Sequence, residues 1–146
     1  MEFQFQFVFQ LILAVVLGGV IGLERELKKR EAGLQTFSLV ALGSCLFTIT
    51  CFELFNNFYI KSGVSFDPSR IIQAIAIGIG FIGAGVIIYR GARIEGITTA
   101  AGLWCSAAVG IAVGVKFYFL ALFTTLLAVI ILAGFGALER KYFKKD

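Results

Sequence analysis

Eight residues, GIGFIGAG at positions 78–85, contain the glycine spacing of a dinucleotide-binding loop. Their first six letters satisfy G-x-G-x-x-G, in which glycines let a backbone approach a pyrophosphate at the start of a helix. That chemistry also needs a preceding strand and an acidic residue about 20 positions further on. Here Glu95 comes too early, and residues 71–89 form an uncharged apolar run between Arg70 and Arg90. We therefore predict that the segment spans a membrane and binds no nucleotide.

A second group of residues has the chemistry of a cation site. Glu53 lies near the end of an apolar run, in FELFNN, and Asp67 follows after the next loop. Carboxylate and amide oxygens suit Mg2+, and a mostly hydrated Mg2+ needs only one or two carboxylates. Asp67 and Pro68 also have the pattern of a helix start, as N-cap and first helical residue. Two interpretations stay open: a metal contact by Glu53 and Asp67, or helix capping alone.

A charged segment, GLERELKKR, follows the first apolar run. Glu24 with Lys28, and Glu26 with Arg30, stand four residues apart in the order that favours helical ion pairs. The first helix is therefore predicted to continue into this segment. Gly33, which lies just beyond, is predicted to end it.

The charged positions nearest the membrane also allow two interpretations. Glu24 and Arg25 either belong to a basic collar that contacts anionic headgroups, or face the helix bundle and serve a gate or a partner. Thr98 or Thr99 is expected to begin a helix after the turn at residues 90–96. The positive end of that helix could receive an anion, or the turn is only a short basic loop.

The composition indicates which elements must position these residues. The chain has 146 residues, 59% hydrophobic and 15% charged, without histidine, and its mean hydropathy is +0.93. Soluble domains are far less apolar. Five apolar runs each approach the roughly 20 residues that a spanning helix needs. We predict an all-α, polytopic membrane protein with one domain over residues 1–146 and helices at about 3–23, 37–60, 71–89, 97–115 and 117–138.

The basic residues predict an orientation. Ten of the 13 Lys and Arg follow the first and third predicted helices or lie at the C-terminus. By the positive-inside rule, the N-terminus is outside and the C-terminus is cytoplasmic. The net charge of +4 is then a consequence of topology, and no nucleic-acid partner is expected.

Small residues repeat along several predicted helices. In the fourth helix they form a stripe with one member every four positions: Thr98, Gly102, Ser106, Gly110 and Gly114. Because helices in lipid associate through close backbone contact, such residues predict helix packing. The same role is predicted for the glycines of the third helix, namely Gly78, Gly80, Gly83 and Gly85, with a row at Ala76, Gly80 and Ala84. An alternative is a narrow conduit with Thr98, Thr99 and Ser106 as polar lining.

Two further features concern packing and chemistry. Gly18 and Gly22 give the first helix a single G-x-x-x-G step, and Trp104 falls inside the fourth helix, where it is predicted to pack between helices. The sequence contains no recognisable set of nucleophile, base and orienting group, so no enzyme is expected.

Five blocks of this sequence resemble the signature blocks of the MgtC/SapB family, and they occur in the family's order. The blocks are GLERE at 22–26, AGLQT at 32–36, DPSR at 67–70, GIGFIGAGVI at 78–87 and GITTAAGLWCSAAVG at 96–110. The resemblance implies a five-helix protein of the bacterial inner membrane. It also implies functional positions, which are Glu24, Arg25, Thr36, Asp67, Arg70, Thr99, Trp104 and the glycines of the third helix.

The resemblance implies a biological role as well. The family's namesake is linked to growth at low Mg2+, survival in macrophages and restraint of the F-type ATP synthase, which makes that synthase an implied partner. This chain has Gln35 where the family usually has Arg, which removes a charge from the predicted cytoplasmic side. The namesake also has a soluble C-terminal domain, whereas this sequence stops at Asp146, and functions of that domain are not expected to transfer.

Two functional hypotheses follow. The first is a non-enzymatic membrane protein of magnesium or ion homeostasis that modulates a membrane partner. The second is a small oligomeric transporter or channel for Mg2+ or another ion, with a fluoride-type channel as a weaker variant. The expected partners are the lipid bilayer and a second copy or another membrane protein. No bound cofactor is expected apart from Mg2+.

Overall fold

The computed structural model describes residues 2–62, 67–90 and 93–142. Five helices are long and apolar enough to cross a membrane, which confirms the predicted all-α, polytopic membrane fold. The elements in order are α1 (Glu2–Leu27), α2 (Leu34–Ser62), α3 (Ser69–Val86), β1 (Ile88–Arg90), β2 (Arg93–Glu95), α4 (Ile97–Gly114), α5 (Tyr118–Ile130), the π-helical turn η1 (Ile131–Phe135) and α6 (Gly136–Tyr142).

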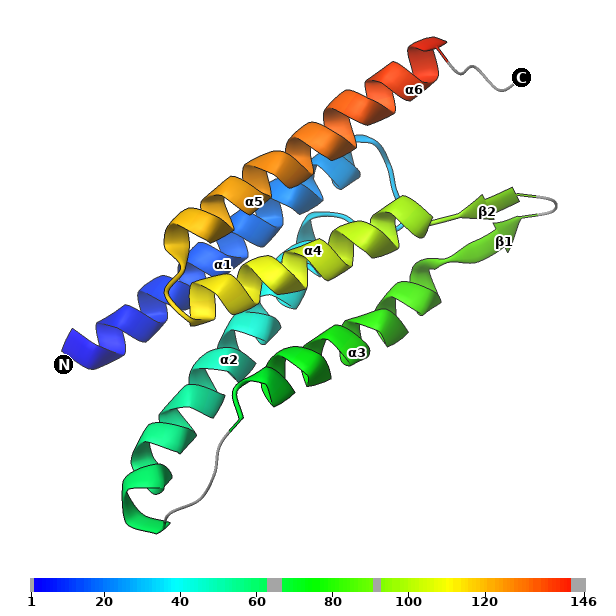
Figure 1. Cartoon of the computed structure of the whole chain (residues 1–146). Coiled ribbons are helices and arrows are strands. Elements are labelled where there is room, and N and C mark those ends of the chain that lie inside the picture. Colours follow the sequence, from blue (N-terminus) through cyan, green and yellow to red (C-terminus); the bar gives the residue numbers. More distant parts are fainter. Residues whose placement is uncertain (1, 63–66, 91–92, 143–146) are drawn as a thin grey trace.

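Helix α4 forms the centre of the bundle. It contacts α1, α2, α3 and α5, and Figure 1 shows α1 and α5 on one side of it and α3 on the other. In the membrane-crossing window of α4, 56% of residues are buried, against 17% in α3. The core of the protein therefore lies where α4 meets α1 and α2, and α3 is a peripheral helix.

A small hairpin replaces part of the predicted third helix and the predicted turn. Helix α3 ends at Val86, and β1 then pairs antiparallel with β2, with Ile88 opposite Glu95. Gly96 has φ +89 and packs so closely on the carbonyl of Val86 that a Cβ would overlap it. This positive φ favours glycine, and it lets the chain turn directly from the hairpin into α4.

The end of α1 also differs from the sequence prediction. Lys29, with φ 51, leaves the helical conformation, and the backbone N–H of Arg30 donates to the carbonyl of Arg25. This is a Schellman-type ending in which Lys29 takes the usual place of glycine. Gly33 is therefore not the residue that ends the helix. It lies against the Glu26 side chain, whose carboxylate accepts from the N–H of Leu34.

A buried glutamine joins α1 to the end of α4. Gln10 is fully buried, and its Nε2 donates to the carbonyls of Val113 and Gly114 at 2.8 and 2.9 Å. Carbonyls in the last turn of a helix lack intrahelical partners. Gln10 supplies a donor to two carbonyls at this end, of which that of Val113 also accepts from the backbone N–H of Lys116. Lys116, with φ 67, starts the turn into α5.

Candidate functional site

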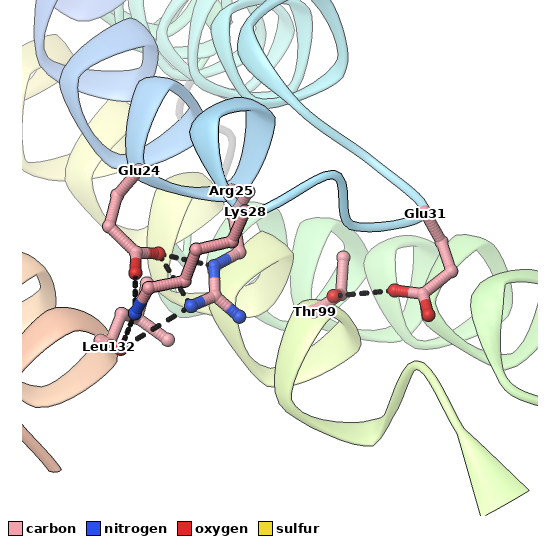
Figure 2. Close-up of polar contacts among 6 residues, drawn as sticks. All are labelled: Glu24, Arg25, Lys28, Glu31, Thr99 and Leu132. Carbon is pink, nitrogen blue, oxygen red and sulfur yellow. Dashed lines mark hydrogen bonds and ion pairs between the residues drawn. The ribbon is translucent and has the colours of Figure 1, made fainter. Parts of the chain in front are cut away.

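Charged side chains of α1 meet the π-helical turn of the C-terminal helix (Figure 2). Arg25 is 3% exposed; its guanidinium forms an ion pair with Glu24 at 2.5 Å, and Nη2 lies 3.4 Å from the carbonyl oxygen of Leu132. Lys28 forms an ion pair with the same carboxylate and donates from Nζ to the Leu132 carbonyl at 2.8 Å. We call Glu24, Arg25, Lys28 and the Leu132 carbonyl the α1–η1 cluster.

The position of these residues on α1 explains the geometry. Glu24 and Lys28 are one turn apart and lie on the same side of the helix, and Arg25 points into the bundle. Burying an unpaired charge costs free energy, so Arg25 needs both its carboxylate and its carbonyl partner. Of the two interpretations left open for Glu24 and Arg25, the geometry agrees with the one in which they face the bundle.

A second polar contact lies at the same end of the bundle (Figure 2). Thr99 is 1% exposed, and its hydroxyl donates to Glu31 Oε2 at 2.9 Å. Glu31 belongs to the loop between α1 and α2, so the bond joins this loop to the first turn of α4. Thr98 points away and is exposed. The structure thus brings Glu24, Arg25 and Thr99 to one end of the protein. It forms the predicted pair of Glu24 with Lys28, whereas sequence reasoning missed Glu31 and Leu132.

The small-residue stripe of α4 lies against α2 from Gly102 onward. The Ser106 hydroxyl donates to the carbonyl of Phe37 at 2.9 Å. A Cβ at Gly110 would overlap the carbonyl of Ala41, and one at Gly114 would lie 2.7 Å from Thr48. From Gly102 to Gly114, α2 lies directly against the stripe, which leaves no room for a conduit along this part of α4 within the single chain.

Gly102 and the glycines of α1 make comparable contacts. A Cβ at Gly102 would lie 3.1 Å from the Phe37 ring, and one at Gly18 or Gly22 would lie within 2.8 Å of α2 or the residues just before it. Helices α1 and α4 therefore both reach close backbone contact with α2, as their small residues predict.

The glycines of α3 do not follow the prediction. Only Gly83 faces a neighbour, with Ala100 of α4 at 3.4 Å, while Gly78, Gly80 and Gly85 have open space in front of them. The predicted row through Gly80 is therefore wrong, because α3 packs on α4 through the face that carries Ile75, Ile79 and Gly83.

An apolar groove separates α2 from α3. Its volume is about 740 Å³, and its walls include Gln35, Thr36 and Ser44 of α2 and Gly78 of α3. Thr36, a position implied by the family resemblance, therefore lies in a wall of this groove and not in the α1–η1 cluster.

The position of Trp104 contradicts the prediction that this side chain packs between helices. It is 57% exposed, on the face of α4 away from α2. An indole on this face is placed to contact lipid or another protein chain.

At the other end of the bundle, Asp67 caps α3. Its Oδ1 accepts from the backbone N–H of Ser69 at 2.9 Å, and Pro68 has helical φ and ψ values of −61° and −23°. The hydrogen bonds from Ser69 to the carboxylate hold the pKa of Asp67 below its usual range. Arg70 is exposed. The predicted capping geometry is thus present.

The structure does not join Glu53 to Asp67 in a metal site. Glu53 and Asn57 line a separate hollow of about 330 Å³ between α1 and α2, and Asp67 is not among its lining residues. Within residues 2–62, 67–90 and 93–142, no group of three or more His, Cys, Asp or Glu side chains is placed to hold a metal ion.

Comparison with known proteins agrees with this architecture. Residues 11–141 match the MgtC family. The chain is 38% identical over 141 residues to "Putative magnesium transporter YhiD" of Escherichia coli K12, covering 97% of this chain and 66% of that protein. It is 38% identical to "Protein SrpB" of Synechococcus elongatus, covering 90% and 76% of the two chains. It is 40% identical to "Protein MgtC" of Salmonella typhimurium, covering 75% and 44%.

The chain thus spans slightly less than two thirds of the E. coli relative and less than half of the Salmonella relative. No solved structure matches it significantly. The family match covers most of the chain, from α1 through the π-helical turn and into α6, and includes every residue of the α1–η1 cluster. This multi-pass membrane protein belongs to the MgtC family.

Proposed function

We propose that this protein is a non-enzymatic component of magnesium or ion homeostasis in the bacterial inner membrane, which acts by modulating a membrane partner. The observation that carries the proposal is the closed centre of the bundle. Helix α2 packs against the small residues of α4 from Gly102 to Gly114, and the Ser106 hydroxyl donates to the carbonyl of Phe37.

The charged groups support the same proposal. Arg25 and Lys28 are engaged by Glu24 and by the carbonyl of Leu132, so these charges contribute to contacts between helices of one chain. A conducting protein instead needs polar groups that an ion can reach along its path. A compact bundle with such internal contacts is suited to present fixed surfaces to another membrane protein. The F-type ATP synthase implied by the family resemblance is one candidate partner.

A second candidate function is transport by an oligomer. The name of the E. coli relative, "Putative magnesium transporter YhiD", favours it. A path for Mg2+ would then lie between copies of the chain, because the α4 stripe is closed within one copy.

Flux measurements distinguish the two functions. Purified protein is reconstituted into liposomes that contain a Mg2+-sensitive dye, and uptake is compared with protein-free vesicles, with Asp67→Asn and with the control Glu2→Gln. The proposal expects no uptake above empty vesicles from folded protein. Protein-dependent uptake that Asp67→Asn abolishes and Glu2→Gln preserves would establish transport instead.

A growth assay tests the role in cells independently of flux. The gene is expressed in a bacterium that lacks its own family member, and growth is followed at low Mg2+. We expect rescue by the wild-type protein although it shows no flux in liposomes. Failure to rescue, with protein present in the membrane, would remove the homeostasis role.

The proposed orientation has its own test. In a variant without native cysteines, single cysteines replace Arg30 in the α1–α2 loop and Phe117 before α5, both of which are exposed. A membrane-impermeant thiol reagent applied to intact cells should label Phe117→Cys and not Arg30→Cys. The reverse labelling pattern would invert the proposed topology.

A further inference from the structure

The C-terminal helix changes its hydrogen-bonding register where it meets α1. Helix α5 ends at Ile130, the π-helical turn η1 covers Ile131–Phe135, and α6 continues from Gly136. Figure 1 shows these three segments as one long rod beside α1. A π-helical turn uses i→i+5 bonds and is rare, so its presence requires a local cause.

The α1–η1 cluster supplies such a cause. The carbonyl of Leu132, inside η1, accepts from Lys28 Nζ at 2.8 Å and faces Arg25 Nη2 at 3.4 Å. Hydrogen bonds from charged donors are stronger than those between neutral groups, and a carbonyl without a donor is costly in a membrane. The cluster therefore stabilises a turn that helical propensity alone disfavours.

Two glycines fit this arrangement. A Cβ at Gly136 would lie 3.5 Å from Lys28 Nζ, so this glycine lies directly beside the ammonium group. Gly134 lies within η1 and faces open space, so no packing contact on that side holds the turn in place. Glycine also weakens the α-helical alternative.

We propose that the α1–η1 cluster is a register switch, in which Lys28 is the positioning residue that holds Ile131–Phe135 in the π-helical form. When the contact of Lys28 with the Leu132 carbonyl is broken, this segment returns to α-helical bonding. Each α-helical residue turns the chain by roughly 100°. The change from π-helical to α-helical bonding shifts the register of the following residues by one, so it rotates α6 by about that angle relative to α5. The contacts of the charged residues of α1 thereby determine which face α6 presents to its surroundings.

The first test measures the rotational phase of α6 in lipid bilayers. In the full chain without native cysteines, spin labels are placed one at a time at positions 136–142, and their accessibility to oxygen and to a water-soluble nickel complex is recorded. In Lys28→Met, the periodic profile should shift by one residue. The control Lys29→Met, which removes the same charge from an exposed neighbour, should keep the wild-type profile.

Deletion of Gly134 calibrates this assay. A π-helical turn accommodates one extra residue, so removing one residue from η1 should restore α-helical bonding and leave α6 in its wild-type phase. Adding Lys28→Met to this deletion should then cause no shift. A wild-type profile in folded Lys28→Met, or a shift by Lys28→Met that persists in the deletion variant, would overturn the proposal.

A second measurement leaves Lys28 in place. In the Gly134 deletion, the residues around Leu132 take α-helical bonding, and the proposal expects Lys28 to lose the Leu132 carbonyl as its acceptor. Acylation of Lys28 by an amine reagent, quantified by mass spectrometry, should then rise several-fold, while that of Lys29 stays constant. Unchanged acylation of Lys28 in the deletion variant would also overturn the proposal, whatever the yield of Lys28→Met.

Discussion

Helices α3 and α4 are both rich in small residues, but they use them differently. In α4, Gly102, Ser106 and Gly110 lie against α2. In α3, Gly83 alone among the predicted packing glycines has a neighbour, and Gly78 borders an open groove. A small residue permits close approach between helices, but it contributes to packing only where another helix lies opposite. The contrast separates glycines that hold the bundle together from glycines that leave a surface free.

The strongest test of this contrast exchanges equivalent glycines for leucine. Gly110→Leu should destabilise the protein by about 3 kcal/mol or more, because the new side chain must displace the backbone of α2 at Ala41. Gly78→Leu, which points into open space, should change stability by less than about 0.5 kcal/mol. Thermal unfolding and the yield of monodisperse protein in detergent measure both. Equal behaviour of the two variants would contradict the distinction.

A smaller effect is expected within α3 itself. Gly83→Leu should cost about 1 to 3 kcal/mol, because its Cβ meets Ala100 at ordinary contact distance and the rest of the leucine has to displace α4. Gly80→Leu is the matched control, since no neighbouring helix comes within 4 Å of the place that its Cβ would occupy. Chemical or thermal unfolding in detergent compares them. If Gly80→Leu were the more damaging change, α3 would have to pack through its other face.

Hydrogen bonding along α4 gives a third comparison. Ser106→Ala removes a bond to the carbonyl of Phe37 and should cost about 1 kcal/mol, the usual value for a hydrogen bond between membrane helices. Thr98→Ala, on the exposed first turn of the same helix, should have no measurable effect. A lower melting temperature for Ser106→Ala, but not for Thr98→Ala, would confirm the contribution of this hydrogen bond.

The smallest expected effect concerns the helix starts and depends on pH. The pKa of Asp67 is lowered in the folded state, so its cap stabilises α3 fully above the unfolded pKa of about 3.9. The stabilisation is lost as the pH falls through the lower folded-state pKa. Helix α4 begins directly after Gly96, which has no titratable side chain to act as a cap.

Amide exchange compares the two helix starts. Protection of the N–H of Ser69 should fall as the carboxylate is protonated, after correction for intrinsic exchange, whereas protection at the start of α4 should stay constant over the same range. Asp67→Asn should remove the pH dependence. A dependence that persists in this variant would assign it to another group.

Several features of the fold follow from sequence patterns because they depend on local or one-dimensional properties. The five spans follow from the length of apolar runs. The cap at Asp67 depends on residues that are adjacent in the chain. The stripe through Gly110 is a regular repeat along one helix, and close packing in lipid needs such a repeat.

Other features could not be predicted in this way. In a membrane, the outside of a bundle is as apolar as its inside, so hydrophobicity does not tell which face of a helix is buried. This is why the sequence pattern predicts an interior position for Trp104, which is exposed, and a neighbour for Gly80, which has none on its open side. Gln10 gives no local signal, because its partners lie more than 100 positions away.

The sequence by itself determined that this chain crosses a membrane five times, and it located the charges that border the first span. Length, hydropathy and residue spacing are properties of the chain, and they do not depend on how the helices pack. Only the tertiary structure decided which small residues face another helix and that Arg25 and Lys28 meet the carbonyl of Leu132. These contacts join segments about 100 positions apart. Their geometry depends on how the helices are placed in three dimensions, which no local pattern specifies.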